Sequence, residues 1–354
     1  MAERVTIQDI ADALGLSRNT VSKAINNTGV LADSTRERVL QKAIEMGYKQ
    51  FTYINAEDLS LPNQHNTPAT QGEIAVLTCA KLGHSHFSAT MLDKFQCEMS
   101  KLGYSTTMHR VNSYELDTLQ LPNSFRKENT VAVMCIETFH YDYARMVCAL
   151  DIPVLFVDHP VLDGRPLPAD RLLMNNRDEI FSFIREMKNR NLTRIGFVGE
   201  YMHCQSFFER YMAFREGMYV NLLPIREEFC ILEKASESVP NESLAYQNYL
   251  CEHLKCLKEL PDVFVCANDF IAIDLLQAFR SLDISVPKDV LLCGFDDSPE
   301  SRVITPPLTS IHIHGEILGL SAVDLILSRI KQPDLNYRTM YAETNLVYRK
   351  STNN

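Results

Sequence analysis

Residues 6–26 read TIQDIADALGLSRNTVSKAIN, and this stretch decides how the beginning of the chain folds. Its first part carries apolar residues at intervals of three and four, which predicts an amphipathic helix. Thr6 offers the side-chain oxygen that an N-cap needs, and Asp9 offers the partner for a capping box. Gly15 predicts the helix end, because glycine adopts the left-handed conformation at little cost. The predicted inward face consists of Ile7, Ile10, Ala11 and Leu14.

A second helix is predicted directly after Leu16, with Ser17 as its N-cap and Val21, Ala24 and Ile25 facing inward. Two helices joined by a short glycine turn form a helix-turn-helix, whose second helix enters the DNA major groove. The alternative is a small helical cap whose polar face is merely hydrated. Against it, residues 16–32 contain no acidic side chain. The outward set can bond bases and phosphates, and it consists of Arg18, Asn19, Ser22 and Lys23.

The charge distribution allows only one end of the chain to approach DNA. The 354 residues carry a net charge of -10, which argues against a protein coated for nonspecific nucleic-acid binding. The first fifty residues hold seven Lys and Arg against six Asp and Glu, so their net charge is +1 and that of the remainder is -11. An apolar content of 45% can form a sizeable core, and the length suggests two or three folding units.

The ten cysteines indicate a reducing compartment. Even the closest pair, Cys251 and Cys256, is too widely spaced for a Cys-x-x-Cys metal clip, and most of the others lie in apolar runs, where a thiol behaves as a small hydrophobe. Neither a signal peptide nor a membrane-spanning stretch is visible in the sequence. We therefore expect a cytoplasmic protein without membrane association.

Beyond residue 73 the sequence alternates between short apolar runs and helical patterns, which predicts parallel sheets covered by helices. The predicted strands fall in two sets, at 74–79, 104–108, 130–136 and 153–157, and then from 172 onward at 194–198, 228–232, 263–267 and 290–295. The predicted fold class is an all-α helix-turn-helix headpiece followed by an α/β bilobal domain with two doubly wound parallel sheets. Ligands of such sheets bind at the carboxyl ends of strands, so the site is expected in the cleft between the lobes.

The predicted domains are a headpiece at 1–50, a linker or atypical hinge at 51–72 and a bilobal effector-binding and dimerisation domain at 73–354. Within the last, the first lobe is expected at 73–160 plus 290–315, and the second at 162–289 plus 316–350. The linker is polar and shows little periodicity.

Polar residues at predicted strand ends are the candidates for ligand binding. Arginine is a planar donor fork and aspartate a pure acceptor, so with asparagine they can bracket the vicinal hydroxyls of a sugar. For Asp296 the alternative is a helix cap or loop carboxylate, and for Phe139 it is ordinary core packing. The candidates are Ser206, Arg210, Asn268 and Asp296, together with Phe139 and Asp158 at the ends of earlier strands.

The headpiece resembles that of the LacI/GalR (lactose-repressor) family of bacterial transcription regulators. The resemblance rests on residues 6–11 and 16–26, on 34–39 (STRERV), and on Gly47-Tyr48. It implies that Arg18 and Asn19 chiefly select the DNA sequence and that Thr6, Thr35 and Tyr48 lie on the phosphate side. The operator-contacting positions that it implies are Ser17, Arg18, Asn19, Thr20, Ser22, Lys23 and Asn26.

The body is similar to the same family, and hence to the periplasmic sugar-binding fold, in residues 206–210, 267–269, 294–297, 306–311 and 346–352. The resemblance implies effector contacts at Arg210, Asn268 and Asp296, and aromatic stacking near His86 and Phe87, for which core packing of Phe87 is the alternative. Two departures stand out. Residues 51–71 lack the family's Ala-x-x-Leu-Ala hinge core, and His312-Ile313-His314 replaces a segment that commonly carries glutamine.

These observations predict a sequence-specific transcription regulator, a repressor, that binds a pseudo-palindromic double-stranded operator as a homodimer and responds to a small molecule, a sugar or its derivative. The alternative is a cytoplasmic ligand-binding or sensory protein with weakened operator binding. An enzyme is not expected, because no nucleophile elbow, Walker loop or dinucleotide-binding glycine motif is visible. No cofactor is expected. The pairs His84/His86 and His312/His314 suggest a metal, but they lack a carboxylate or thiol companion at ligand spacing.

Overall fold

The structure, a computed structural model, describes residues 5–25, 33–46, 48, 71–79, 86–162, 164–233 and 243–353. The chain forms two compact units, Met1–Thr67 and Pro68–Asn354. Apart from its last two residues, the hinge predicted at 51–72 lies outside the described residues.

The first unit contains the two predicted helices, α1 (Ile7–Leu14) and α2 (Arg18–Ile25), followed by a third, α3 (Asp33–Glu45). The predicted capping box is confirmed: Asp9 N donates to the Thr6 hydroxyl at 3.3 Å, and Thr6 N donates to the Asp9 carboxylate at 2.7 Å. Gly15 ends α1 with φ of 65°, as predicted. The helices enclose one small core, consisting of Ile10, Ala11, Val21, Ala24, Val39 and Ala43.

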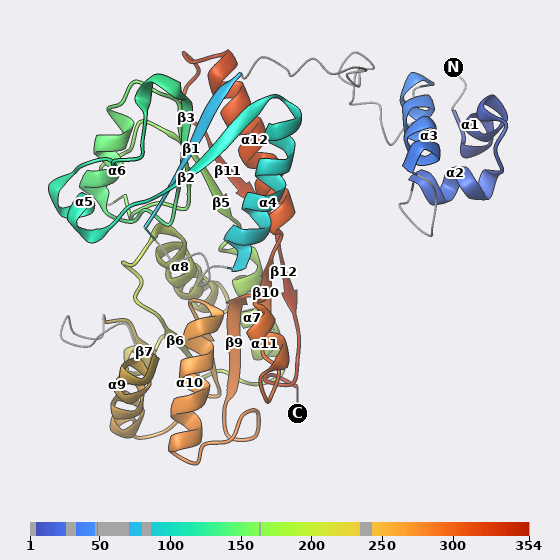
Figure 1. Cartoon of the computed structure of the whole chain (residues 1–354). Helices are drawn as coiled ribbons and strands as arrows, with labels where there is room; N and C mark the ends of the chain where they lie inside the picture. Colours follow the sequence, from blue (N-terminus) through green and yellow to red (C-terminus); the bar gives the residue numbers. More distant parts are fainter. Residues whose placement is uncertain are drawn as a thin grey trace. The chain divides into compact units, whose positions relative to one another are not determined.

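The second unit is bilobal, and each lobe is built on a six-stranded sheet (Figure 1). The first sheet has the order β11-β5-β4-β3-β1-β2, with all pairs parallel. Its central strand β3 reads TVAVMCI and is buried along most of its length, as expected for a parallel strand covered on both faces. Its strands are β1 (Gly72–Thr78), β2 (Tyr104–Arg110), β3 (Thr130–Ile136), β4 (Val154–Val157), β5 (Asp170–Met174) and β11 (Thr339–Ala342). The helices of this part of the chain are α4 (His86–Lys101), α5 (Ser113–Thr118), the 3-10 turn Lys127–Asn129, α6 (Tyr141–Cys148) and α12 (Gly315–Lys331).

The second sheet has the order β12-β10-β9-β8-β6-β7, and only β12 runs antiparallel to its neighbour. Its strands are β6 (Ile195–Val198), β7 (Cys230–Ile231), β8 (Val263–Cys266), β9 (Leu291–Asp296), β10 (Thr309–Ile313) and β12 (Thr344–Val347). The helices of this part of the chain are α7 (Asp178–Asn189), α8 (Gln205–Val220), the 3-10 turn Glu227–Phe229, α9 (Ser243–Cys256), α10 (Asp269–Ser281) and α11 (Pro299–Val303).

The lobes divide the chain differently from the prediction. Residues 290–315 were assigned to the first lobe, but β9 and β10 lie in the second sheet. The second lobe was expected to include 162–174 and 316–342, but β5 and β11 lie in the first sheet and α12 packs against α4. Strand periodicity predicts that a strand exists but does not identify its neighbour, which is why these assignments were wrong.

The chain passes between the lobes three times, but not at residues 160–162, where the first predicted lobe gives way to the second. It crosses at 175–177 after β5, at His314 after β10, and at Glu343 between β11 and β12. These crossovers place the carboxyl ends of both parallel sheets on the two sides of one cleft. None of the helices in the described ranges combines the length and the apolar composition of a membrane-spanning segment.

A buried ion pair joins the late segments of the first lobe to β5. Asp170 is 2% exposed and accepts hydrogen bonds at 2.9 Å from both Nε and Nη2 of Arg329, and one at 2.8 Å from the backbone N–H of Arg338. Burial raises the pKa of Asp170, but these hydrogen bonds outweigh burial and hold the pKa below its ordinary value.

Replacing Asp170 by Asn should lower the free energy of unfolding by roughly 3–5 kcal/mol near neutral pH, because the buried Arg329 guanidinium loses its counter-charge. The loss should diminish as the pH falls through the lowered pKa of Asp170, where the native carboxylate is itself protonated. Urea unfolding followed by circular dichroism measures both effects. Asp324→Asn, at an exposed position of α12, is the matched control and should change stability by less than about 0.5 kcal/mol. Equal losses in the two variants would contradict the role of the pair.

Candidate functional site

The second helix of the headpiece presents a polar face of the predicted composition. Arg18, Asn19 and Lys23 are exposed, whereas Val21 and Ala24 are buried against α1 and α3. A helix N-terminus with exposed Arg and Asn is suited to contacts with base edges.

The hydroxyl groups around this helix also stabilise its start. Ser17 Oγ accepts from the Thr20 backbone N–H at 3.1 Å and lies 2.8 Å from the Thr20 hydroxyl, so both residues take part in the cap. Thr6 caps α1 in the same way. The remaining predicted contacts are Ser22, Thr35 and Tyr48, all half-buried, and Asn26, which lies outside the described residues.

A cavity of about 220 Å³ lies in the cleft of the bilobal unit. Six of the eight predicted effector residues line it, and they come from strand ends and helices associated with both sheets. The predicted residues that meet there are Phe139, Asp158, Ser206, Arg210, Asn268 and Asp296. His86 and Phe87 form the start of α4, but the positions of their side chains lie outside the described part of the chain.

Arg210 is the fixed centre of the cavity. Its guanidinium is 3% exposed and lies 3.5 Å from the ring centroid of Phe295, over the ring face. Nε donates to Asn176 Oδ1 at 2.9 Å, Nη1 donates to the Ala267 carbonyl at 2.6 Å, and Nη1 lies 3.5 Å from Asp296 Oδ1. These contacts hold the donor fork in one orientation, as recognition of a small polar ligand requires.

Asp296 is the last residue of β9 and has a φ of 109°. Its side chain is 18% exposed. Burial raises the pKa of this carboxyl to about 8, against the opposing effect of Arg210 and with further support from Asp269, Glu137 and Asp158. Near neutral pH the carboxyl therefore carries a proton and can donate as well as accept hydrogen bonds.

Two other cavity carboxylates, on Glu137 and Asp158, also follow strand ends with positive φ, of 52° and 55°. Backbone held in this region by a residue other than glycine is a common feature of ligand sites. The Asp158 carboxylate accepts from the backbone N–H groups of His159 at 2.8 Å and Ser206 at 3.2 Å, so it joins the end of β4 to the start of α8 across the cleft.

Five lining residues were not predicted: Glu137, Met174, His203, Cys204 and Phe207. For Glu137 the signal was present, because it directly follows the predicted strand at 130–136. Met174 falls within the predicted second lobe, but it ends β5 of the first sheet. His203 lies in the turn before α8. Its ring centroid is 5.1 Å from that of Phe139 and 5.2 Å from that of Phe207. This contact among three rings cannot be predicted from the spacing of the residues in the sequence.

The second histidine pair has protein partners. His312 Nδ1 lies 3.0 Å from Asp297 Oδ2, and His314 Nε2 lies 2.5 Å from Asn345 Oδ1. Across the described ranges, no group of three or more His, Cys, Asp or Glu side chains is arranged to hold a metal ion. His84 of the other pair lies outside those ranges.

Comparison with known proteins matches both units. Residues 6–50 match the family "Bacterial regulatory proteins, lacI family", and residues 184–352 match the "Periplasmic binding protein-like domain". The HTH-type transcriptional repressor PurR of Actinobacillus pleuropneumoniae serotype 3 (strain JL03) is 28% identical over 353 residues, which cover 99% of this chain and 98% of the relative.

Two solved structures have the same fold over nearly the whole chain. The complex of the transcriptional regulator CelR with cellobiose gives a TM-score of 0.67 at 20% identity, covering 98% of this chain and 100% of that one. The lac repressor dimer bound to operator and the anti-inducer ONPF gives a TM-score of 0.64 at 19% identity, covering 99% of each chain.

A helix-turn-helix unit followed by a bilobal ligand-binding unit defines a DNA-binding protein with an effector domain. The chain belongs to the LacI family of bacterial regulatory proteins. It is a transcription regulator, and the predicted family and fold class are confirmed.

Replacing Asp296 by Asn should make stability less sensitive to pH between about pH 5 and 8. The folded chain keeps this proton up to about pH 8, whereas the unfolded chain loses it near 3.8. The folded state therefore binds one more proton in this window, and the carboxyl lowers stability as the pH rises, by at most about 1.4 kcal/mol per pH unit.

Urea unfolding at three pH values tests this expectation. Asn cannot titrate, so the stability of the Asp296→Asn variant relative to the unsubstituted chain should increase with pH. Asp142→Asn, at an exposed position of α6, is the control: its free energy of unfolding should change with pH in the same way as that of the unsubstituted chain. If the free energy of unfolding of the Asp296→Asn variant shows the same pH dependence as that of the unsubstituted chain, the Asp296 carboxyl is not protonated in the folded state.

Proposed function

We propose that this regulator is a repressor that binds a pseudo-palindromic operator as a homodimer and is controlled by a sugar or sugar derivative bound between its lobes. The main support for this proposal is the cleft cavity, where the buried guanidinium of Arg210 and the carboxyl groups at strand ends lie close together. The lac repressor of similar fold is described as a dimer on its operator, which supports the same assembly here. Two headpieces related by a two-fold axis would read two half-sites.

Operator contacts are assigned to the exposed face of α2 and to the hydroxyl groups around it. Arg18 and Asn19 select bases, and Ser17, Thr20, Ser22, Lys23 and Asn26 complete the contact set. Thr6, Thr35 and Tyr48 lie on the phosphate side. The exposure of Arg18, Asn19 and Lys23 on one short helix supports this assignment.

The effector class follows from the chemistry of the cavity. Arg210 and the Asn268 amide nitrogen supply donors, and Asp158 and Asp296 supply acceptors, which suits vicinal hydroxyl groups. The similar CelR was solved with cellobiose, which supports a carbohydrate. Phe139 and Phe207 can cover an apolar sugar face, and Ser206 lines the same cavity. The proposed set also includes His86 and Phe87, which follow from the family resemblance.

Control of the operator by the effector requires two lobe arrangements that bind the effector with different affinities. The three crossovers and the Asp158–Ser206 hydrogen bond join the lobes beside the cavity, so a ligand there would bias their arrangement. We infer a cytoplasmic binding protein rather than an enzyme, because its proposed partner is DNA, its relative is a repressor, and all ten cysteines are free thiols.

Selection on random DNA duplexes tests the operator assignment. The unsubstituted chain should enrich a pseudo-palindromic site, and Arg18→Ala and Asn19→Ala should each relax the preference at one base position by about 1–3 kcal/mol. Gln41→Ala, at an exposed position of α3, should enrich the same site as the unsubstituted chain. No enriched site, with or without sugars, would favour a sensory protein without operator function. An unchanged site in both variants would reject the two contacts.

A thermal-shift screen of sugars and nucleosides should identify the effector class through a raised Tm. Arg210→Ala and Asp296→Ala should each weaken the response to the best sugar by about tenfold or more, because each leaves a buried partner unsatisfied. Operator binding should survive. Arg215→Ala is the matched control, since Arg215 lies on the same helix but pairs with Glu227 at the surface. A nucleoside shift without a sugar shift would overturn the carbohydrate assignment, and an unchanged sugar response would remove that residue from the site.

A further inference from the structure

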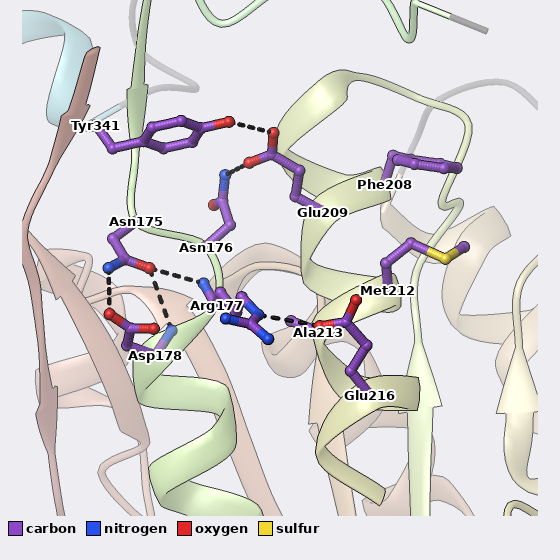
Figure 2. Close-up of a pocket in the computed structure, with 10 residues that line it drawn as sticks. All are labelled: Asn175, Asn176, Arg177, Asp178, Phe208, Glu209, Met212, Ala213, Glu216 and Tyr341. Carbon is purple, nitrogen blue, oxygen red and sulfur yellow. Dashed lines mark hydrogen bonds and ion pairs between the residues drawn. The ribbon is translucent and has the colours of Figure 1, made fainter. Parts of the chain in front are cut away.

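A second cavity, of about 460 Å³, lies on the other side of the Glu209–Arg210 turn of α8 and shares no lining residue with the effector cavity. Figure 2 shows its three walls: the crossover after β5, one face of α8, and Tyr341 on β11. These segments come from both lobes, so the cavity adjoins two of the three crossovers. Neither the operator contacts nor the proposed effector site uses it.

The α8 wall is amphipathic. Glu209, Met212, Ala213 and Glu216 follow one another at intervals of three, one and three, which places them on a single helical face. Met212 and Ala213 lie between the two carboxylates along the helix, and the Met212 and Phe208 side chains point together to one side of α8 (Figure 2). A ligand in this cavity would therefore meet an apolar surface with a carboxylate at either end.

Acidic groups outnumber basic ones around the cavity. Glu209, Glu216 and Asp178 line it together with one guanidinium, that of Arg177, whose Nε already donates to Glu216 Oε2 at 3.0 Å. An organic cation suits this balance better than a neutral or anionic molecule, and the face of Phe208 adds a surface that attracts cations.

Glu209 is the polar centre of the cavity. One of its oxygens accepts from the Tyr341 hydroxyl at 3.0 Å, and the other accepts from Asn176 Nδ2 at 2.9 Å (Figure 2). The first oxygen also accepts from Gln205 Nε2 at 3.1 Å. A carboxylate offers about four acceptor sites, so these three bonds leave capacity for one further donor. Asn176 is 2% exposed and is itself held by Arg210, which fixes the position of Glu209.

We propose that this cavity is a second small-molecule site, which binds an organic ammonium ion carrying an apolar body. The ammonium group donates to Glu209, with Glu216 nearby as a second negative charge, and the apolar body lies against Met212, Ala213 and Phe208. This assignment stands on the cavity itself and does not depend on the identity of the effector or the operator.

Phenethylamine is a suitable probe, because it combines an ammonium group with an apolar ring. Isothermal titration of the full chain near neutral pH should show binding of phenethylamine and at least about tenfold weaker binding of phenethyl alcohol, which has the same shape without the charge. Equal binding of the two molecules, or no binding of phenethylamine, would overturn the proposal.

Two substitutions should act in opposite directions. Glu209→Gln removes the charge and should weaken phenethylamine binding by about tenfold. Tyr341→Phe removes one competing donor from Glu209 and should strengthen binding by about threefold, whereas a purely structural role for Tyr341 predicts weakening. Tyr341 is 53% exposed, so its hydroxyl can be removed without threatening the fold.

Glu252→Gln is the matched control, since Glu252 is an exposed helix carboxylate that pairs with Lys255 outside the cavity. It should leave binding unchanged. If Glu209→Gln fails to fold, Glu216→Gln replaces it, because Glu216 is exposed and its loss leaves Arg177 unpaired beside the cation. Full-strength binding in the Glu209 or Glu216 variant, or weakening in the Tyr341 variant, would refute the assignment.

Discussion

The guanidinium of Arg210 cannot be buried without acceptors, and much of the bilobal unit is arranged to supply them. Taking a charge out of water costs several kcal/mol unless hydrogen bonds and other polar contacts replace hydration. Arg210 obtains these from the crossover at Asn176, from the carbonyl that follows β8, and from the carboxyl that ends β9, while the Phe295 ring covers one face. The geometry of the cleft therefore follows from the requirements of one side chain on α8.

Local signals in the sequence predicted the headpiece almost completely. Thr6, Asp9 and Gly15 act within one or two helical turns of their own position, so reading them needs no knowledge of distant contacts. The strand-end rule and the family resemblance together predicted Arg210, Asn268 and Asp296 as cleft residues, and all three line one cavity.

Long-range pairing is what the sequence did not reveal. The pattern of β5 resembles that of any buried strand, and its place beside β4 and β11 depends on Asp170, whose partners Arg329 and Arg338 lie far along the chain. A lone carboxylate after a strand, such as Glu137, is too common to identify a site without its spatial neighbours. The contact between Phe139 and His203 depends on how two lobes meet, which periodicity does not encode. The second cavity is likewise a product of the crossovers and of one face of α8.

The single residue between β11 and β12 has a consequence for how the chain is synthesised. These two strands complete the outer edges of different sheets, so both lobes lack an edge strand until residues 339–347 have left the ribosome. Until then β5 and β10 each present an unpaired edge, which is a template for association with other chains. Asp170 also lacks its hydrogen-bond donors until Arg329 and Arg338 have been synthesised. Completion of both sheets therefore depends on one short segment, so the two lobes gain their last strands together rather than one after the other.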